Sequence, residues 1–183
     1  MPVMSRPFSL ILISILALWF LPSGWSRAGT ESNLDAEIES YVKSLRRTGA
    51  IKGSERTAWL VYDFTSGKKL ASINENVQLQ AASMIKPYLA LAFFHQVGAG
   101  KLSYGAQARR HMELMIQRSN NTSTNWVMRQ TGGPAATQAL LKRHYPSLCR
   151  QLHLVEYIPS GGRTYLNLGS AGDYSRFPVS YTH

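Results

Sequence analysis

The stretch that decides the fold is residues 80–98, QAASMIKPYLALAFFHQVG. Apolar side chains fill most of this stretch, which predicts a central helix that is buried on nearly every face. Pro87 lies in the expected first turn, where a missing N–H is best tolerated. Ser83 and Lys86 stand at the start of the helix, one turn apart, so we expect a hydroxyl and an amine on the same face.

The hydroxyl of Ser83 and the amine of Lys86 together suggest a catalytic role. Burial disfavours the charged form of Lys86, and a neutral amine can take the proton of Ser83 and make its oxygen a nucleophile. The chain holds two further Ser-x-x-Lys copies, which start at Ser40 and Ser66. Their contexts predict a polar helix face and an exposed hairpin turn, so burial favours the copy at Ser83. The alternative is an N-cap serine followed by a lysine that reaches solvent.

The flanking segments predict an α+β protein. We expect a first helix over residues 31–47, and two strands over 57–64 and 69–73 that form a hairpin. The later expected helices cover residues 107–118, 122–130, 134–144 and 170–177, and a short extended segment covers 152–158. Because a two-stranded hairpin is marginal alone and no convincing further strand follows, we expect an antiparallel sheet of which only the N-terminal hairpin is present, beside an all-helical subdomain.

A second motif, Ser-x-Asn, also occurs three times, starting at Ser72, Ser119 and Ser123. The copy Ser119-Asn120-Asn121 falls in a tight polar break between two expected helices. Such a break can present a hydroxyl and an amide to a cleft. The alternative is a helix C-cap followed by an N-cap, which needs no chemistry.

The first 28 residues read as a secretory signal peptide. Arg6 precedes an apolar run over residues 8–21, and Ser26-Arg27-Ala28 offers a cleavage site after Ala28. We therefore expect a mature domain over residues 29–183, exported to the periplasm or the medium, with no stable membrane span after cleavage. The alternative is an uncleaved membrane anchor.

The charge balance is strongly basic, at +10 for the whole chain and +8 once Arg6 and Arg27 are removed with the leader. The basic residues are scattered, which argues against nucleic acid and favours anionic surroundings such as wall polymers. Cys149 is the only cysteine, so no internal disulfide is possible. The histidines show no ligand spacing, and we predict no metal site, no cofactor and a monomer.

Four ordered stretches then point to one family. They are QAASMIKP at 80–87, YDFTSGK at 62–68, MIQRSNNT at 115–122 followed by Asn125 and Gly132-Gly133-Pro134, and SAGDYSRF at 170–177. Together they resemble the class A β-lactamases and their penicillin-binding serine hydrolase relatives, over roughly residues 33–177. The resemblance implies a β-lactamase/transpeptidase-like fold and a small-molecule substrate, either a β-lactam or a cell-wall peptide.

The resemblance also implies roles for four residues. Ser83 would be the acylated nucleophile and Lys86 its general base, directly or through water. Ser119 would pass a proton to the leaving nitrogen, and Asn121 would bind a substrate amide. The backbone N–H of Ser83 would supply half of the oxyanion hole.

Three departures from the family pattern stand out. The family's Lys-Thr/Ser-Gly strand is absent, and residues 178–183 do not continue the last expected helix, so we expect a C-terminally truncated domain. If Leu166-Asn167 ends the omega-loop motif, Arg163 stands where the deacylating glutamate should be, and Glu156 fits that role poorly. An acyl-enzyme could then form but would hydrolyse slowly. Asn120 also stands where an Asp is usual.

Three functions therefore remain open from the sequence. The first is a serine hydrolase acting on the cyclic amide of β-lactams, impaired by the missing strand. The second is a penicillin-binding protein of the D-Ala-D-Ala peptidase type. The third is a non-catalytic, exported wall-binding pseudoenzyme that uses its positive charge rather than Ser83.

Overall fold

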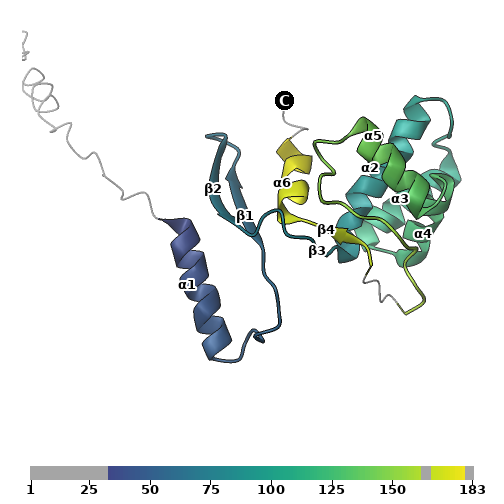
Figure 1. The fold of residues 1–183 in the computed structure, drawn as a ribbon. Helices are drawn as coiled ribbons and strands as arrows, with labels where there is room; N and C mark the ends of the chain where they lie inside the picture. The colour runs from purple at the N-terminus through teal and green to yellow at the C-terminus, as the bar shows by residue number, and fades with distance from the viewer. Residues whose placement is uncertain (1–32, 162–165, 180–183) are drawn as a thin grey trace, which may run out of the picture. The chain divides into compact units, whose positions relative to one another are not determined.

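The chain is described by a computed structural model that covers residues 33–161 and 166–179 (Figure 1). The expected signal peptide and its cleavage site lie outside the described residues. By their contacts, the described residues from Leu34 onwards belong to one unit. No helix within the described ranges is long and apolar enough to cross a bilayer.

The first part is one helix and one hairpin. Helix α1 (Leu34–Arg47) carries acidic residues in its first turn and basic ones in its last, which suits the helix dipole. Strands β1 (Trp59–Asp63) and β2 (Lys68–Ile73) pair antiparallel. Asp35 of α1 accepts a hydrogen bond from the backbone N–H of Ser72 in β2 at 2.7 Å. The expected helix and hairpin are both confirmed, and within the described residues this sheet has two strands.

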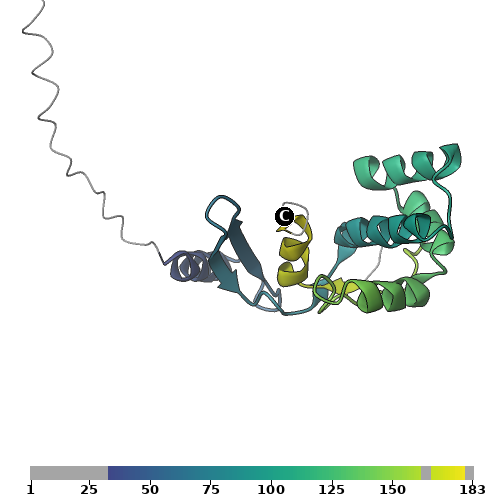
Figure 2. The ribbon, with the colours of Figure 1, turned by 90° about the horizontal axis from the view of Figure 1, so that it is seen from above.

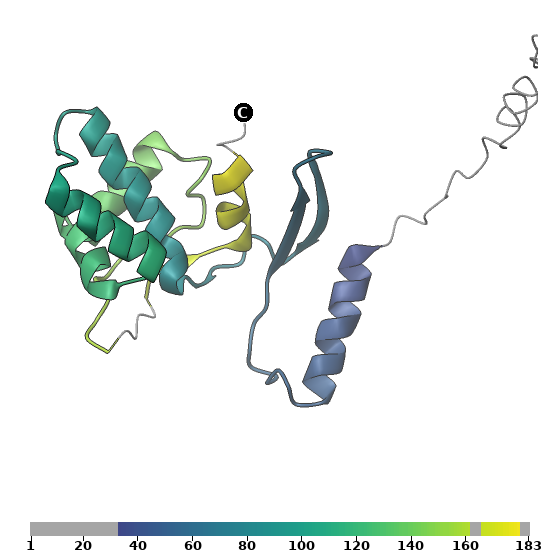
Figure 3. The same cartoon turned by 180° about the vertical axis from the view of Figure 1, so that it is seen from behind.

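Most of the remaining chain is helical (Figures 1 and 2). The helices are α2 (Lys86–Gly98), α3 (Ala106–Arg118), α4 (Asn121–Gln130), α5 (Pro134–His144) and α6 (Ala171–Val179). Helix α2 contacts α3, α4 and α5. Helix α6 lies between the hairpin and these helices in opposite views (Figures 1 and 3): it contacts β1, and its Phe177 ring meets Tyr88 of α2 edge to face.

The main core surrounds α2, as the apolar stretch predicts. Tyr88, Leu89 and Phe93 of this helix are fully buried, against Met115 of α3 and Met128 of α4. The expectation of burial on nearly every face is wrong in one respect, because Phe94 is 42% exposed. One side of the helix therefore remains open.

The start and the end of the helical part differ from the expected boundaries. Ser83 lies in a 3₁₀ turn, η1 (Ala82–Ile85), and the α-helix proper begins at Lys86. The last helix continues to Val179 instead of ending at residue 177. A second small ladder pairs β3 (Leu79–Gln80) with β4 (Leu168–Gly169). A strand of two residues is too short to show alternating apolar and polar side chains, so the sequence did not predict this ladder.

The long segment after α5 is held by two partly buried side-chain amides. Gln138 of α5 accepts from the N–H of Leu154 and donates to the carbonyl of Leu152. Asn125 of α4 makes the same double contact with the backbone of Ile158, at 2.7 and 2.8 Å. These bonds fix an irregular stretch that would otherwise leave backbone polar groups unpaired.

Candidate active site

The position of Ser83 is set by the short ladder before it. The backbone N–H of Ala81 donates to the carbonyl of Asn167 at 2.9 Å, which continues the β3–β4 pairing. Ala82 then adopts a left-handed conformation, with φ of 46°. A left-handed backbone is uncommon for a residue other than glycine and costs energy, so the surrounding structure must hold it. The chain thus turns sharply just before Ser83.

The second motif lies in the turn between α3 and α4. Ser119 ends α3 in a left-handed conformation, with φ of 52°. Asn120 is the N-cap of α4, and its side chain accepts from the N–H of Ser123 at 2.8 Å. A side-chain oxygen at this position satisfies one of the free N–H groups of the helix start. Asn120 therefore performs a capping role, and Asn121 opens the helix.

The amine of Lys86 brings the four predicted residues together. Its Nζ donates to Ser83 Oγ at 3.0 Å, Ser119 Oγ at 2.6 Å and Asn121 Oδ1 at 3.3 Å. A fourth oxygen, the backbone carbonyl of Ser119, lies 2.7 Å from Nζ, so at most three N–H groups are shared among four acceptors. Residues more than 30 positions apart in the sequence thus share one nitrogen atom.

The two hydroxyls also contact each other. Ser83 Oγ and Ser119 Oγ are 2.8 Å apart, so these oxygens and the amine form a closed triangle of hydrogen bonds. Lys86 is buried, at 3% exposure, whereas Ser83 and Ser119 are exposed. A proton can pass between any two corners of this triangle, and the hydroxyls stay open to a substrate.

Burial controls the charge of the amine. Loss of solvation lowers the pKa of Lys86 from its ordinary value of 10.5. Within the described residues, the hydrogen-bond partners of Nζ are hydroxyl, amide and carbonyl oxygens, and no carboxylate pairs with it. The neutral form, which can act as a base, is therefore more accessible than in an exposed lysine.

The other motif copies have different environments. Lys69, of the copy at Ser66, pairs with Glu75 at 2.6 Å in the exposed hairpin. The copy at Ser40 lies on α1, where both Ser40 and Lys43 are exposed. Only the copy at Ser83 combines a buried amine with a neighbouring hydroxyl.

Two loop residues were considered for deacylation, and the structure describes one of them, Glu156. One carboxylate oxygen of Glu156 accepts from the N–H of Leu166 at 3.1 Å. Arg163 lies outside the described residues. Asn167 is fully buried, and its side chain bonds the backbone of Val155 and Glu156. This position therefore braces the loop, a role that sequence spacing did not predict.

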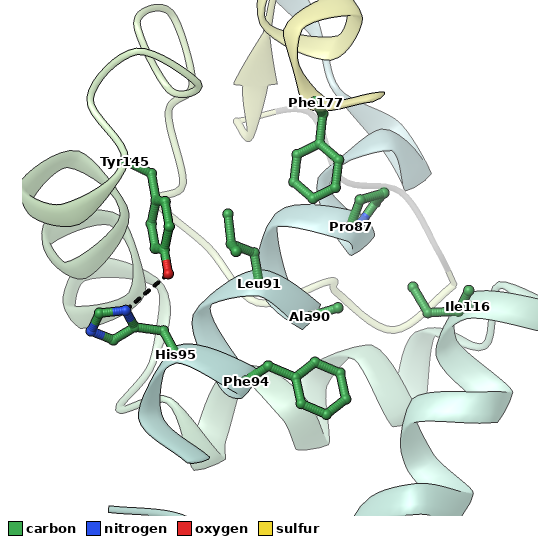
Figure 4. A pocket seen from close by; sticks show the side chains of 8 residues that line it. All are labelled: Pro87, Ala90, Leu91, Phe94, His95, Ile116, Tyr145 and Phe177. Atoms are coloured by element: carbon green, nitrogen blue, oxygen red, sulfur yellow. Dashed lines mark hydrogen bonds between the residues drawn. The ribbon is translucent and has the colours of Figure 1, made fainter. Parts of the chain in front are cut away.

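A separate apolar hollow lies beside α2 (Figure 4). It has a volume of about 490 Å³. Its lining residues are Pro87, Ala90, Leu91, Phe94, His95, Ile116, Tyr145 and Phe177. His95 and Tyr145 close one end through a 3.0 Å hydrogen bond. None of the four predicted site residues lines this hollow.

Comparison with known proteins finds a match in sequence for part of the chain. The family model described as "Beta-lactamase enzyme family" matches residues 37–111, which include Ser83 and Lys86 but end before Ser119. No curated protein matches the chain.

Solved structures extend the likeness to most of the chain. An ancestral class A β-lactamase superposes with a TM-score of 0.55 at 20% identity, over 75% of this chain and 60% of that one. A β-lactamase from Streptosporangium roseum gives a TM-score of 0.57 at 15% identity, over 80% and 63%. The chain thus has a β-lactamase-like fold and spans about 60% of the length of the ancestral enzyme.

Proposed function

We propose that this chain, β-lactamase-like in its fold and in the matched part of its sequence, is a serine acyl-transfer protein in which Ser83 attacks a cyclic amide. The observation that carries the proposal is the triangle formed by Ser83 Oγ, Lys86 Nζ and Ser119 Oγ, whose sides are 3.0, 2.6 and 2.8 Å. A buried, readily discharged amine beside an exposed hydroxyl is the arrangement that activates a serine.

The geometry supports a simple proton route. Neutral Lys86 takes the proton of Ser83 as Oγ bonds to the carbonyl carbon of the substrate. The carbon–nitrogen bond of the amide then breaks, and the leaving nitrogen takes a proton from Ser119 Oγ. The protonated Lys86 returns a proton to Ser119, and Ser83 is left as an ester. Asn121, whose amide borders the same amine, would donate a hydrogen bond to the substrate.

A β-lactam is the proposed substrate, and a cell-wall peptide of the D-Ala-D-Ala type is the alternative. We expect the ester to be long-lived: if Leu166-Asn167 ends the omega-loop motif, Arg163 stands where the enzymes that the chain resembles carry the glutamate that activates water. We therefore propose a protein that is acylated faster than it releases product.

Labelling with a fluorescent penicillin tests this proposal. We expect one covalent adduct on the intact protein, found on Ser83 by peptide mass spectrometry, which persists after free penicillin is removed. Ser83→Ala should abolish the adduct, and Ser40→Ala is the matched control in the exposed motif copy on α1. If the folded wild-type protein takes no label, the acyl-transfer function is wrong. Rapid loss of the adduct would refute only the slow second step.

We also propose that the protein is exported, because it would encounter wall peptides and β-lactams outside the cytoplasm. It rests on the sequence of residues 1–28. N-terminal sequencing of the protein recovered from an expressing bacterium should begin at Gly29. Recovery of an intact N-terminus would contradict the signal peptide.

A further inference from the structure

The turn between α3 and α4 carries two of the four site residues, so its position depends on how these helices pack. The two helices contact each other directly. Asn120 anchors the turn from both sides: its N–H donates to the carbonyl of Leu114 in α3, and its carbonyl accepts from the hydroxyl of Thr124 in α4 at 2.8 Å. A small change in the angle between α3 and α4 would move Ser119 relative to Lys86.

One hydrogen bond ties the two helices close to this turn. His111 of α3 bonds the hydroxyl of Ser123 in α4 through its Nδ1, at 3.1 Å. Ser123 is 2% exposed, so its hydroxyl is shielded from water and needs a partner in the protein. The backbone N–H of the same serine donates to the capping oxygen of Asn120. Ser123 therefore connects His111 to the residue between Ser119 and Asn121.

The ring of His111 makes a second contact with α4. It stacks on Trp126, with ring centroids 4.4 Å apart and an angle of 16° between the planes. An imidazole supplies a flat face for the indole and a polar atom for Ser123 at the same time. Phenylalanine would keep only the face, and asparagine would keep only the polar atom at the Nδ1 position.

We propose that His111 is a positioning residue for Ser83 acylation, which holds Ser119 and Asn121 against Lys86 through its bond to Ser123 and its stack on Trp126. The inference rests on the proposed function. Among the described residues, the contacts found for His111 go to Ser123 and Trp126, and none goes to Ser83 or Lys86. It acts on the reacting groups only through the turn.

The test compares acylation kinetics of four variants of the whole protein. His111→Phe and Ser123→Ala each remove the bond, and we expect the acylation rate at saturating penicillin to fall about tenfold, because small misplacements of reacting groups are costly. The half-saturating concentration should change less. His111→Asn restores the polar atom and should recover most of the rate. The double variant His111→Phe/Ser123→Ala should be no slower than either single one, since both remove the same bond.

His153→Phe, in an exposed histidine of the loop, is the matched control and should label at the wild-type rate. If wild type is acylated, an equal rate for His111→Phe would overturn the inference. So would an Asn variant as slow as the Phe variant, or a double variant with multiplied losses. Each of these results would assign His111 no positioning role, whatever happens to thermal stability.

A second measurement separates this inference from the proposed function. The side-chain NMR signal of isotope-labelled Lys86 reports the oxygens around its amine without any substrate. It should move in His111→Phe and return in His111→Asn. If wild type is not acylated but the signal behaves in this way, the proposed function fails and the positioning role stands. If the signal is unchanged in His111→Phe, the positioning role fails.

Discussion

At the scale of single residues, the site depends on the cost of keeping an amine out of water. Lys86 is almost completely buried and is surrounded by oxygen atoms that carry no formal charge. Desolvation disfavours the ammonium form, which is why the pKa of Lys86 is lowered. An exposed lysine would be almost wholly protonated at neutral pH and could not accept the proton of Ser83.

This environment predicts how acylation depends on pH. We expect the rate of Ser83 labelling to rise with pH as Lys86 loses its proton, with a midpoint below the ordinary lysine value of 10.5. Lys86→Met should remove this dependence and most of the rate. Lys86→Arg should be equally slow, because a guanidinium stays protonated. Stopped-flow labelling between pH 6 and roughly pH 10 would measure the profile, and a flat wild-type profile would contradict the base role.

The same shift has a consequence for stability. The folded protein binds the Lys86 proton more weakly than the unfolded chain does, because the pKa is lowered on folding. Folding therefore releases this proton between the lowered pKa and 10.5, and the contribution of Lys86 to stability improves as pH rises through that window. Below the window, both states hold the proton and the buried charge destabilises the fold.

At the scale of secondary structure elements, the periodic spacing of apolar residues in the sequence predicted most of the helices. Helix α5 was expected at residues 134–144 and lies at Pro134–His144. Ser83, Lys86, Ser119 and Asn121 meet as the two motifs together suggested. Their roles stay predictions.

The features that the sequence did not predict depend mostly on contacts between residues that are far apart in the chain. The amides of Asn125 and Asn167 bond backbone groups of a loop, and a backbone group carries no mark in the sequence. The left-handed turn at Ala82 was also missed, because nothing in an alanine suggests a positive φ. The contact of His111 with Ser123 was also missed, because only the packing of α3 on α4 brings the two side chains together.

The attachment of α6 gives a prediction at this scale. Asp173 is fully buried, accepts from the N–H groups of Arg150 and Gln151 at 3.2 and 2.7 Å, and pairs with Arg176. Asp173→Ala would leave two backbone N–H donors and the Arg176 cation without their buried partner, so we expect a loss of about 3 kcal/mol or more in unfolding free energy. Urea unfolding followed by circular dichroism measures it.

An exposed ion pair provides the control for this change. Glu39 and Lys43 on α1 are 3.9 Å apart, and both side chains are more than half exposed. Such pairs contribute little, because solvent screens them. Glu39→Ala should therefore leave the urea midpoint nearly unchanged. A similar loss in both variants would show that Asp173 has no special part in holding α6.

At the scale of the whole molecule, burial is divided unevenly along the chain. The main core is built by α2 to α5 with the loop that follows them, and it includes no residue of α1, β1 or β2. In those three elements, Val42 and Ala71 are the buried apolar residues. Tyr41 and Leu70, and Phe64 directly after β1, are about half exposed or more. Stability should follow this division, since regions with little buried apolar surface open at lower free energy.

Hydrogen exchange would reveal the division directly. We expect backbone amides of β1 and β2 to exchange well before those of α2 and α4, because a two-stranded ladder is marginal and α2 lies at the centre of the core. Asp35→Ala removes the side chain that bonds the N–H of Ser72, so it should speed exchange in β2 and leave α2 unchanged. Uniform protection across both regions, or equal acceleration in both, would mean that hairpin and helices unfold as one cooperative unit.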